Sequence, residues 1–90
     1  MWYVYILRCA DATLYTGSTT DPERRVKTHN SGKGAKYTRG RGPVTVVYRE
    51  FCGDKSAALR REIAIKRLTR AQKLALIGQA GRNPADGKEM

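Results

Sequence analysis

Residues 14–30, LYTGSTTDPERRVKTHN, concentrate side chains that could bind a phosphate and move a proton. Arg25 and His29 are four residues apart, so they share a face if this run is helical. An arginine can bind a phosphate by donating two hydrogen bonds to it, and a histidine titrates near neutral pH. Alone, a strand tyrosine or a polar histidine is more often structural. Together with Tyr5 and Tyr15, this pair indicates phosphate chemistry.

A single carboxylate, Glu62, stands out further along the chain. On a helical wheel it falls inside the core-facing stripe of a predicted helix, where an unpaired charge is costly. Two interpretations stay open: an ion pair with a basic neighbour, or a ligand for one Mg²⁺ or Mn²⁺ ion, which one carboxylate and a substrate phosphate can hold. The aliphatic residues of that stripe are Ala58, Leu59, Ile63 and Ile65.

The charge balance favours a polyanionic partner. The chain has 18 Lys and Arg against 8 Asp and Glu, a formal charge of +10. Between Pro22 and Arg49 there are eight basic residues and one acidic residue. Such a surface attracts nucleic-acid phosphates through counterion release. Composition alone also fits a basic protein that is merely soluble or associated with ribosomes.

A basic, glycine-rich connector, GKGAKYTRGRG, spans residues 32–42. We expect its cations to follow a nucleic-acid backbone and its tyrosine to stack on a base, as in single-strand binding. A flexible basic loop with an incidental tyrosine is the alternative. The predicted nucleic-acid-binding residues are Lys33, Lys36, Tyr37, Arg39 and Arg41.

Ninety residues predict one small domain with a thin core, without room for a large enclosed cavity. We assign it to residues 1–79 and expect a polar, mobile tail over 80–90. Cys9 and Cys52 fit no metal motif and are interpreted as reduced thiols. The apolar start is too short for a signal peptide or a membrane span, so we expect a cytoplasmic protein.

The first half of the chain reads as a hairpin leading into a helix. Strands are predicted over 2–9 and 13–18. A three-residue loop at 10–12 would pair Leu7 with Tyr15 and place Tyr5 on the same face as Tyr15. It requires a left-handed backbone at Ala12. The helix that follows ends near residue 30, and either Thr20 with Glu23 or Asp21 before Pro22 caps its start.

The second half predicts a strand over 44–52, a helix over 54–68 and another from Thr69, capped through Gln72, to about Gly78. The predicted fold is α+β, a small three-stranded, mostly antiparallel sheet flanked by helices.

Two tripeptides in this order resemble the paired motifs of the GIY-YIG nucleases: Tyr3-Val4-Tyr5 and, after a gap of nine residues, Tyr15-Thr16-Gly17. Arg25-x-x-x-His29 and the helix bearing Glu62 continue the resemblance over about residues 2–78. GKGAKYTRGRGPV and GDKSAALRREIAIKRLTRAQK look like the small stand-alone bacterial members. Tyr3 and Thr16 replace the usual glycine and isoleucine, without removing the tyrosines that carry chemistry in the family.

The resemblance implies roles for five residues. Tyr5 would take the proton of the attacking water, Tyr15 would orient the water or phosphate, and His29 would relay the proton. Arg25 would clamp the phosphate and Glu62 would hold the metal. Because a free tyrosine near pKa 10 is a weak base, the base could instead be His29. Some family nucleases also use an asparagine near the C-terminus of the domain; the candidate there is Asn83, in the expected mobile tail, and that role is not carried over.

Two functions remain as hypotheses. The first is a divalent-metal-dependent nuclease that hydrolyses DNA, directed by ends, flaps or lesions, as in DNA repair, rather than by base sequence. The second is a non-catalytic nucleic-acid-binding module for DNA or RNA. Both predict a nucleic-acid partner, most directly DNA, and neither requires a membrane or a small-molecule cofactor. The oligomeric state stays open.

Overall fold

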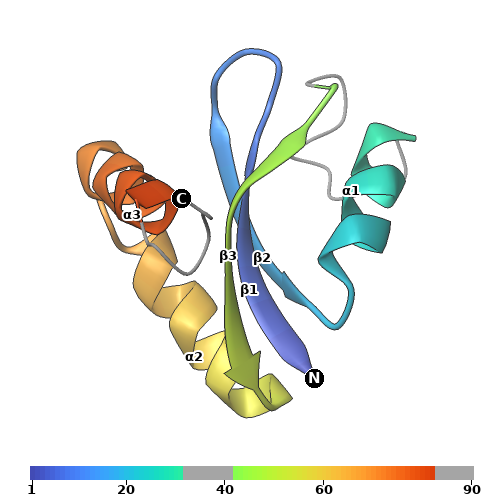
Figure 1. Ribbon diagram of the computed structural model, residues 1–90, viewed down its shortest axis with the longest axis vertical. Helices are drawn as coiled ribbons and strands as arrows, with labels where there is room; N and C mark the ends of the chain where they lie inside the picture. The colour runs from blue at the N-terminus through green and yellow to red at the C-terminus, as the bar shows by residue number, and fades with distance from the viewer. Residues whose placement is uncertain (32–41, 83–90) are drawn as a thin grey trace.

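The computed structural model describes residues 1–31 and 42–82, which fold into one three-stranded sheet and three helices (Figure 1). Along the chain these are β1 (Trp2–Arg8), β2 (Leu14–Thr19), α1 (Pro22–Asn30), β3 (Thr45–Gly53), α2 (Lys55–Lys66) and α3 (Arg70–Arg82). The strand order is β2-β1-β3, and both pairings are antiparallel. The α+β prediction is confirmed. The predicted connector residues Lys33 to Arg41, and the tail from Asn83, lie outside the described residues.

Strand β1 forms the centre of the protein, because helices cover both of its faces. Four consecutive residues are buried, Val4, Tyr5, Ile6 and Leu7, as expected for a strand with apolar side chains on both alternations. Helix α1 lies on one face of the sheet, and α2 and α3 lie on the other (Figure 1). The single strand β1 therefore serves two separate cores.

The β1–β2 turn has the predicted three-residue geometry. Leu7 pairs with Tyr15, and Tyr5 pairs with Gly17. Ala12 adopts φ 69°, the left-handed conformation that this turn requires. The turn is held by Asp11, whose carboxylate accepts hydrogen bonds from the backbone and the hydroxyl of Thr13. This register places both tyrosines on the face covered by α1.

Each helix begins at a side chain that caps its free backbone N–H groups. Asp21 caps α1 by accepting from the Arg24 backbone, with Pro22 at the first helical position. Asp54 caps α2, directly after Gly53 at φ 82°. Thr69 and Gln72 form the predicted reciprocal capping box before α3. Helix α3 continues to Arg82, so its predicted end near residue 78 was wrong; the glycine there is tolerated within the helix.

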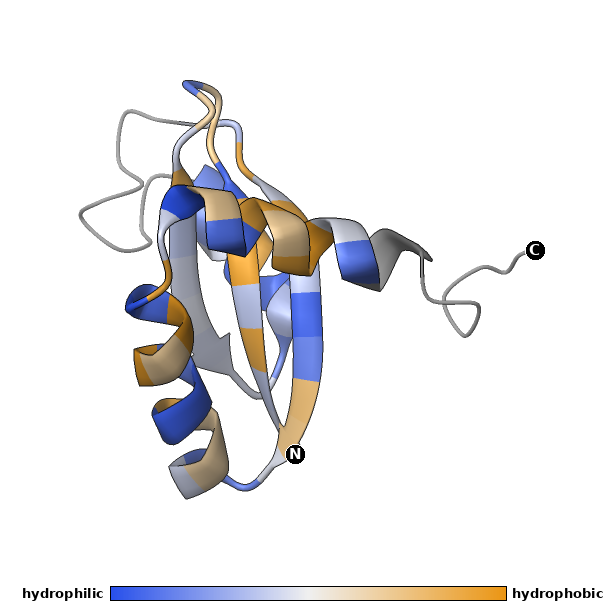
Figure 2. Ribbon diagram, turned by 90° about the vertical axis from the view of Figure 1, so that its left-hand side faces the viewer, coloured by the Kyte–Doolittle hydropathy of each residue, from blue (hydrophilic) through white to orange (hydrophobic). Residues whose placement is uncertain are grey.

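The face of α2 that contacts the sheet differs from the predicted stripe. Ala58 and Ile65 are completely buried, but Leu59 and Ile63 are 42% and 53% exposed, so their assignment to the core was wrong. The face that meets the sheet consists of Ala58 and Ile65 together with Arg61 and Glu62, which bond to Glu50 of β3 and Ser18 of β2. Figure 2 shows α2 descending beside the sheet while α3 crosses it.

The two cysteines are free thiols: Cys9 is buried after β1 and Cys52 is half-buried in β3. Across the described segments of the chain, no helix is long and apolar enough to cross a membrane.

Candidate active site

Three rings meet on the face of the sheet covered by α1. Tyr5 comes from β1, Tyr15 from β2 and His29 from the last turn of α1. The ring centroids of Tyr15 and His29 are 5.3 Å apart, and that of Tyr5 lies 6.4 Å from His29 and 6.5 Å from Tyr15. The Tyr5 hydroxyl lies 3.5 Å from His29 Nε2, a long contact of the kind that tightens when substrate binds. The structure thus brings together three of the predicted catalytic residues.

Gly17 leaves the space that Tyr5 occupies. A Cβ at this position would lie 2.5 Å from the Tyr5 hydroxyl oxygen and 2.7 Å from Cζ. Such distances are well inside van der Waals contact, so any side chain here would displace the tyrosine. The glycine of the second tripeptide is therefore explained by the neighbouring strand, a reason that the sequence alone did not reveal.

The half-buried Arg25 sets the electrostatics of the ring cluster. Burial raises the pKa of the Tyr5 hydroxyl above its usual value near 10, although Arg25 acts in the opposite direction. Burial, and then the charge of Arg25, lower the pKa of His29 below its usual 6.5. Both groups are therefore neutral at pH 7. In the protein alone, burial therefore outweighs Arg25 in setting the pKa of Tyr5.

Glu62 is held on two sides. The Ser18 hydroxyl of β2 donates to Glu62 Oε1 at 2.7 Å, and Lys66 Nζ lies 2.7 Å from Oε2. The ion pair that the sequence left open is therefore present. The side chain of Glu62 is only 17% exposed. Sequence reasoning missed both partners; the spacing of Lys66 four residues after Glu62 could have indicated one of them.

The carboxylate and the rings approach each other across the outer strand of the sheet. In β2, Ser18 points toward α2, while Tyr15 and Gly17 point toward α1. The two groups nevertheless interact, because Glu62 contributes to the raised pKa of Tyr5. The pKa of Lys66 is raised first by its hydrogen bond to Glu62 and further by the nearby tyrosines. All five predicted catalytic and metal-binding residues thus surround one edge of the sheet.

Asn30, at the end of α1, keeps His29 in register with the sheet. Its side-chain amide donates to the Val44 carbonyl at 3.2 Å and accepts from the Val44 backbone N–H at 2.6 Å. This pair of bonds fixes the end of α1 to the start of β3. Asn30 was not among the predicted site residues, because its partner is distant in sequence.

An α+β domain with paired strand tyrosines, an Arg/His helix and a carboxylate across the sheet edge defines a class of nuclease fold. The model of the GIY-YIG catalytic domain matches residues 1–75, and the chain belongs to this family of nuclease domains. A UPF0213 protein of Clostridium perfringens is 62% identical over 77 residues, covering 86% of this chain and 83% of the relative. A UPF0213 protein of Halobacterium salinarum is 59% identical over 76 residues, covering 84% and 99%.

Solved structures agree with the fold. The solution structure of a UPF0213 protein from Bacillus halodurans is 50% identical, with a TM-score of 0.59, covering 92% of this chain and 89% of that one. A protein from E. faecalis is 40% identical, with a TM-score of 0.57, covering 90% and 88%.

Proposed function

We propose that this protein is a divalent-metal-dependent nuclease that hydrolyses phosphodiester bonds in DNA. The observation that carries the proposal is the cluster of the buried Tyr5 and His29 with the half-buried Tyr15, beside Arg25, with the Glu62 carboxylate across the strand edge. A surface that only binds phosphate has no use for neutral proton carriers packed together. Since the donors of this site suit phosphate rather than base edges, we expect substrate structure to direct cleavage.

Arg25 is suited to hold a nonbridging oxygen of the scissile phosphate. Its Nε is buried and has no hydrogen-bond partner among the described residues. A buried donor of this kind is costly to leave unpaired. Binding an anion beside the guanidinium would offset that cost and bring the phosphate next to the ring cluster.

The protonation states favour a relay that ends on His29. At pH 7 Tyr5 keeps its proton, and His29 is neutral, so Nε2 can accept when Nδ1 carries the hydrogen. As the water attacks phosphorus and the bond from phosphorus to the leaving ester oxygen breaks, Tyr5 takes up the water proton and passes its own to His29 Nε2. The leaving oxygen takes a proton from solvent. No free tyrosinate is needed. Tyr15, packed against His29, would orient the water or the phosphate.

Glu62 fits one hard divalent ion. No cluster of three or more His, Cys, Asp and Glu side chains occurs among the described residues, but Mg²⁺ or Mn²⁺ keeps several waters and needs few protein ligands. When bound, the ion would supply Lewis acidity and neutralise charge on the phosphate. Lys66 neutralises Glu62 in the protein alone and would release it to the metal.

The test is cleavage of labelled single-stranded, duplex and flapped DNA, with a matched RNA, in Mg²⁺, Mn²⁺ or EDTA. Glu62→Gln preserves shape and should lose several kcal/mol of transition-state stabilisation, roughly 100-fold or more in rate. DNA affinity should be unchanged or higher, because a negative charge is removed. Glu50→Gln is the control, because it makes the same change in a carboxylate of β3 that is paired with Arg61 of α2 and belongs to no part of the proposed site.

Equal cleavage by wild type and Glu62→Gln would remove Glu62 from the mechanism. If the wild type binds DNA in a salt-sensitive way but does not cleave it with either metal, the nuclease proposal is rejected in favour of the non-catalytic binding module.

A further inference from the structure

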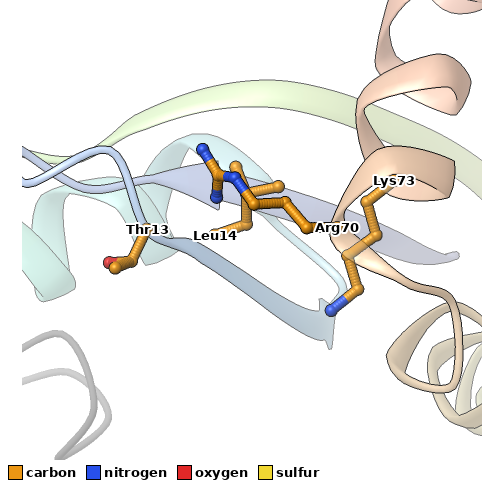
Figure 3. Close-up of a pocket in the computed structure, with 4 residues that line it drawn as sticks. All are labelled: Thr13, Leu14, Arg70 and Lys73. Atoms are coloured by element: carbon orange, nitrogen blue, oxygen red, sulfur yellow. The ribbon is translucent and has the colours of Figure 1, made fainter.

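A basic groove runs between β2 and α3, on the side of the sheet covered by α2 and α3, and reaches Tyr15 at the outer strand β2. It consists of three hollows of about 160, 230 and 360 Å³ that share Leu14. Arg70 and Lys73, three residues apart on α3, line one hollow with Thr13 and Leu14, and the Arg70 guanidinium extends toward Leu14 at the start of β2 (Figure 3). The described residues that line the groove include four cations and no carboxylate; the cations are Arg8, Lys66, Arg70 and Lys73.

Two cations of this groove, Arg70 and Lys73, carry charge that no described carboxylate neutralises, whereas Lys66 is paired with Glu62. Lys73 makes no ion pair with any described residue. Arg70 donates one bond, at 2.9 Å, to the Ala12 carbonyl, which orients the guanidinium without neutralising it. Uncompensated positive charges of this kind, gathered in one hollow, raise the local potential and attract polyanions.

The groove reaches the candidate active site. Tyr15 and Lys66 line the same 360 Å³ hollow as Lys73, and Lys66 is paired with Glu62. Thr16 lines it too, and its buried hydroxyl has no hydrogen-bond partner in the parts of the chain described. Through Tyr15 and Lys66, this end of the groove is shared with the candidate active site.

We propose that this groove binds the backbone of the nucleic-acid strand beyond the scissile phosphate, with successive phosphates at Lys66, Lys73 and Arg70. The strand leaves the tyrosine cluster over the edge of β2 and follows the start of α3. This inference rests on the proposed function for its substrate. It adds a binding surface distinct from the 32–42 connector, and the chemistry recognised is the phosphodiester backbone.

The experiment compares Lys73→Gln with Lys55→Gln, which removes the same charge beside Trp2 at the far end of α2. Fluorescence anisotropy of a labelled single-stranded DNA, its duplex and a matched RNA is measured in EDTA over a range of salt concentrations. Losing one phosphate contact should lower the slope of log affinity against log salt by ~0.7–0.9. Lys73→Gln should show that change and weaken binding several-fold on every probe. Lys55→Gln should leave the slope unchanged.

Equal effects of the two variants would overturn the groove, because net charge alone would then explain binding. The outcome is separate from that of the nuclease test. Normal binding by Lys73→Gln, with cleavage still dependent on Glu62, rejects the groove and keeps the nuclease. Weakened binding by Lys73→Gln, in a protein that never cleaves, keeps the groove and rejects the nuclease.

Discussion

The two faces of β1 have different contents although they belong to one strand. Toward α1 it presents Tyr5 and Leu7, beside a histidine, an arginine and a second tyrosine. Toward α2 and α3 it presents Val4 and Ile6, which pack on Ile65. One face carries hydroxyl and imidazole groups in a buried setting, and the other is aliphatic.

This difference shows how a domain of 90 residues can hold a reactive site. Burying polar rings contributes less to stability than burying aliphatic side chains, because each polar atom must recover its lost hydration. The α2 and α3 face can compensate, since aliphatic burial is worth about 25 cal/mol per Å². We therefore expect substitutions on the α1 face to reduce activity, and those on the opposite face to reduce stability.

The largest expected effect is that of Tyr5→Phe on cleavage. This change keeps the ring packing and removes the relay hydroxyl, so the rate should fall ~10²–10⁴-fold with little change in stability. Tyr48→Phe is the matched control, because its hydroxyl donates to Glu50 on the other face. The control should cost about 1 kcal/mol of stability and leave cleavage intact. Single-turnover rates and urea melts of both variants measure the two effects; the reverse pattern would contradict the division of the faces.

The second largest effect is that of Ile65→Ala on stability. Ile65 is completely buried against Val4 and Ile6, so truncation should cost about 2–5 kcal/mol of unfolding free energy. Ile63→Ala, two residues earlier and 53% exposed, should cost less than about 0.5 kcal/mol. Urea denaturation measures both. Similar losses would mean that α2 packs as its sequence pattern suggested rather than as the structure shows.

The smallest effect concerns pH and the buried His29. Its pKa is lowered in the folded protein by burial and by Arg25, so the unfolded chain binds a proton first as pH falls through about 6.5. The contribution of His29 to the free energy of unfolding is therefore complete above about pH 6.5 and is lost as the pH falls toward the lower pKa of the folded state. His29→Gln should reduce the loss of unfolding free energy between about pH 7 and 5.5. Most carboxylates titrate below this range of pH. Urea midpoints at both pH values provide the test; an unchanged decline would assign it to other groups.

Local chemistry in the chain predicted most of the backbone. The left-handed Ala12 and the Thr69–Gln72 capping box depend on residues within a few positions of each other. The register of the hairpin followed from its loop length, so the shared face of Tyr5 and Tyr15 was predictable too. The spacing of Arg25 and His29 predicted that they share one face of the helix, but it did not predict how deeply each side chain is buried.

What the sequence by itself determined is therefore the set of elements and the reactive residues that each one carries. Tertiary structure alone decided which side of α2 meets the sheet: the polar partners of Arg61 and Glu62 lie on strands distant in sequence, and Leu59 and Ile63 are left exposed. It also decided the partners of Glu62 and the space that Gly17 leaves for Tyr5. These depend on contacts between residues far apart in sequence, where burial and pairing energies exceed local propensity.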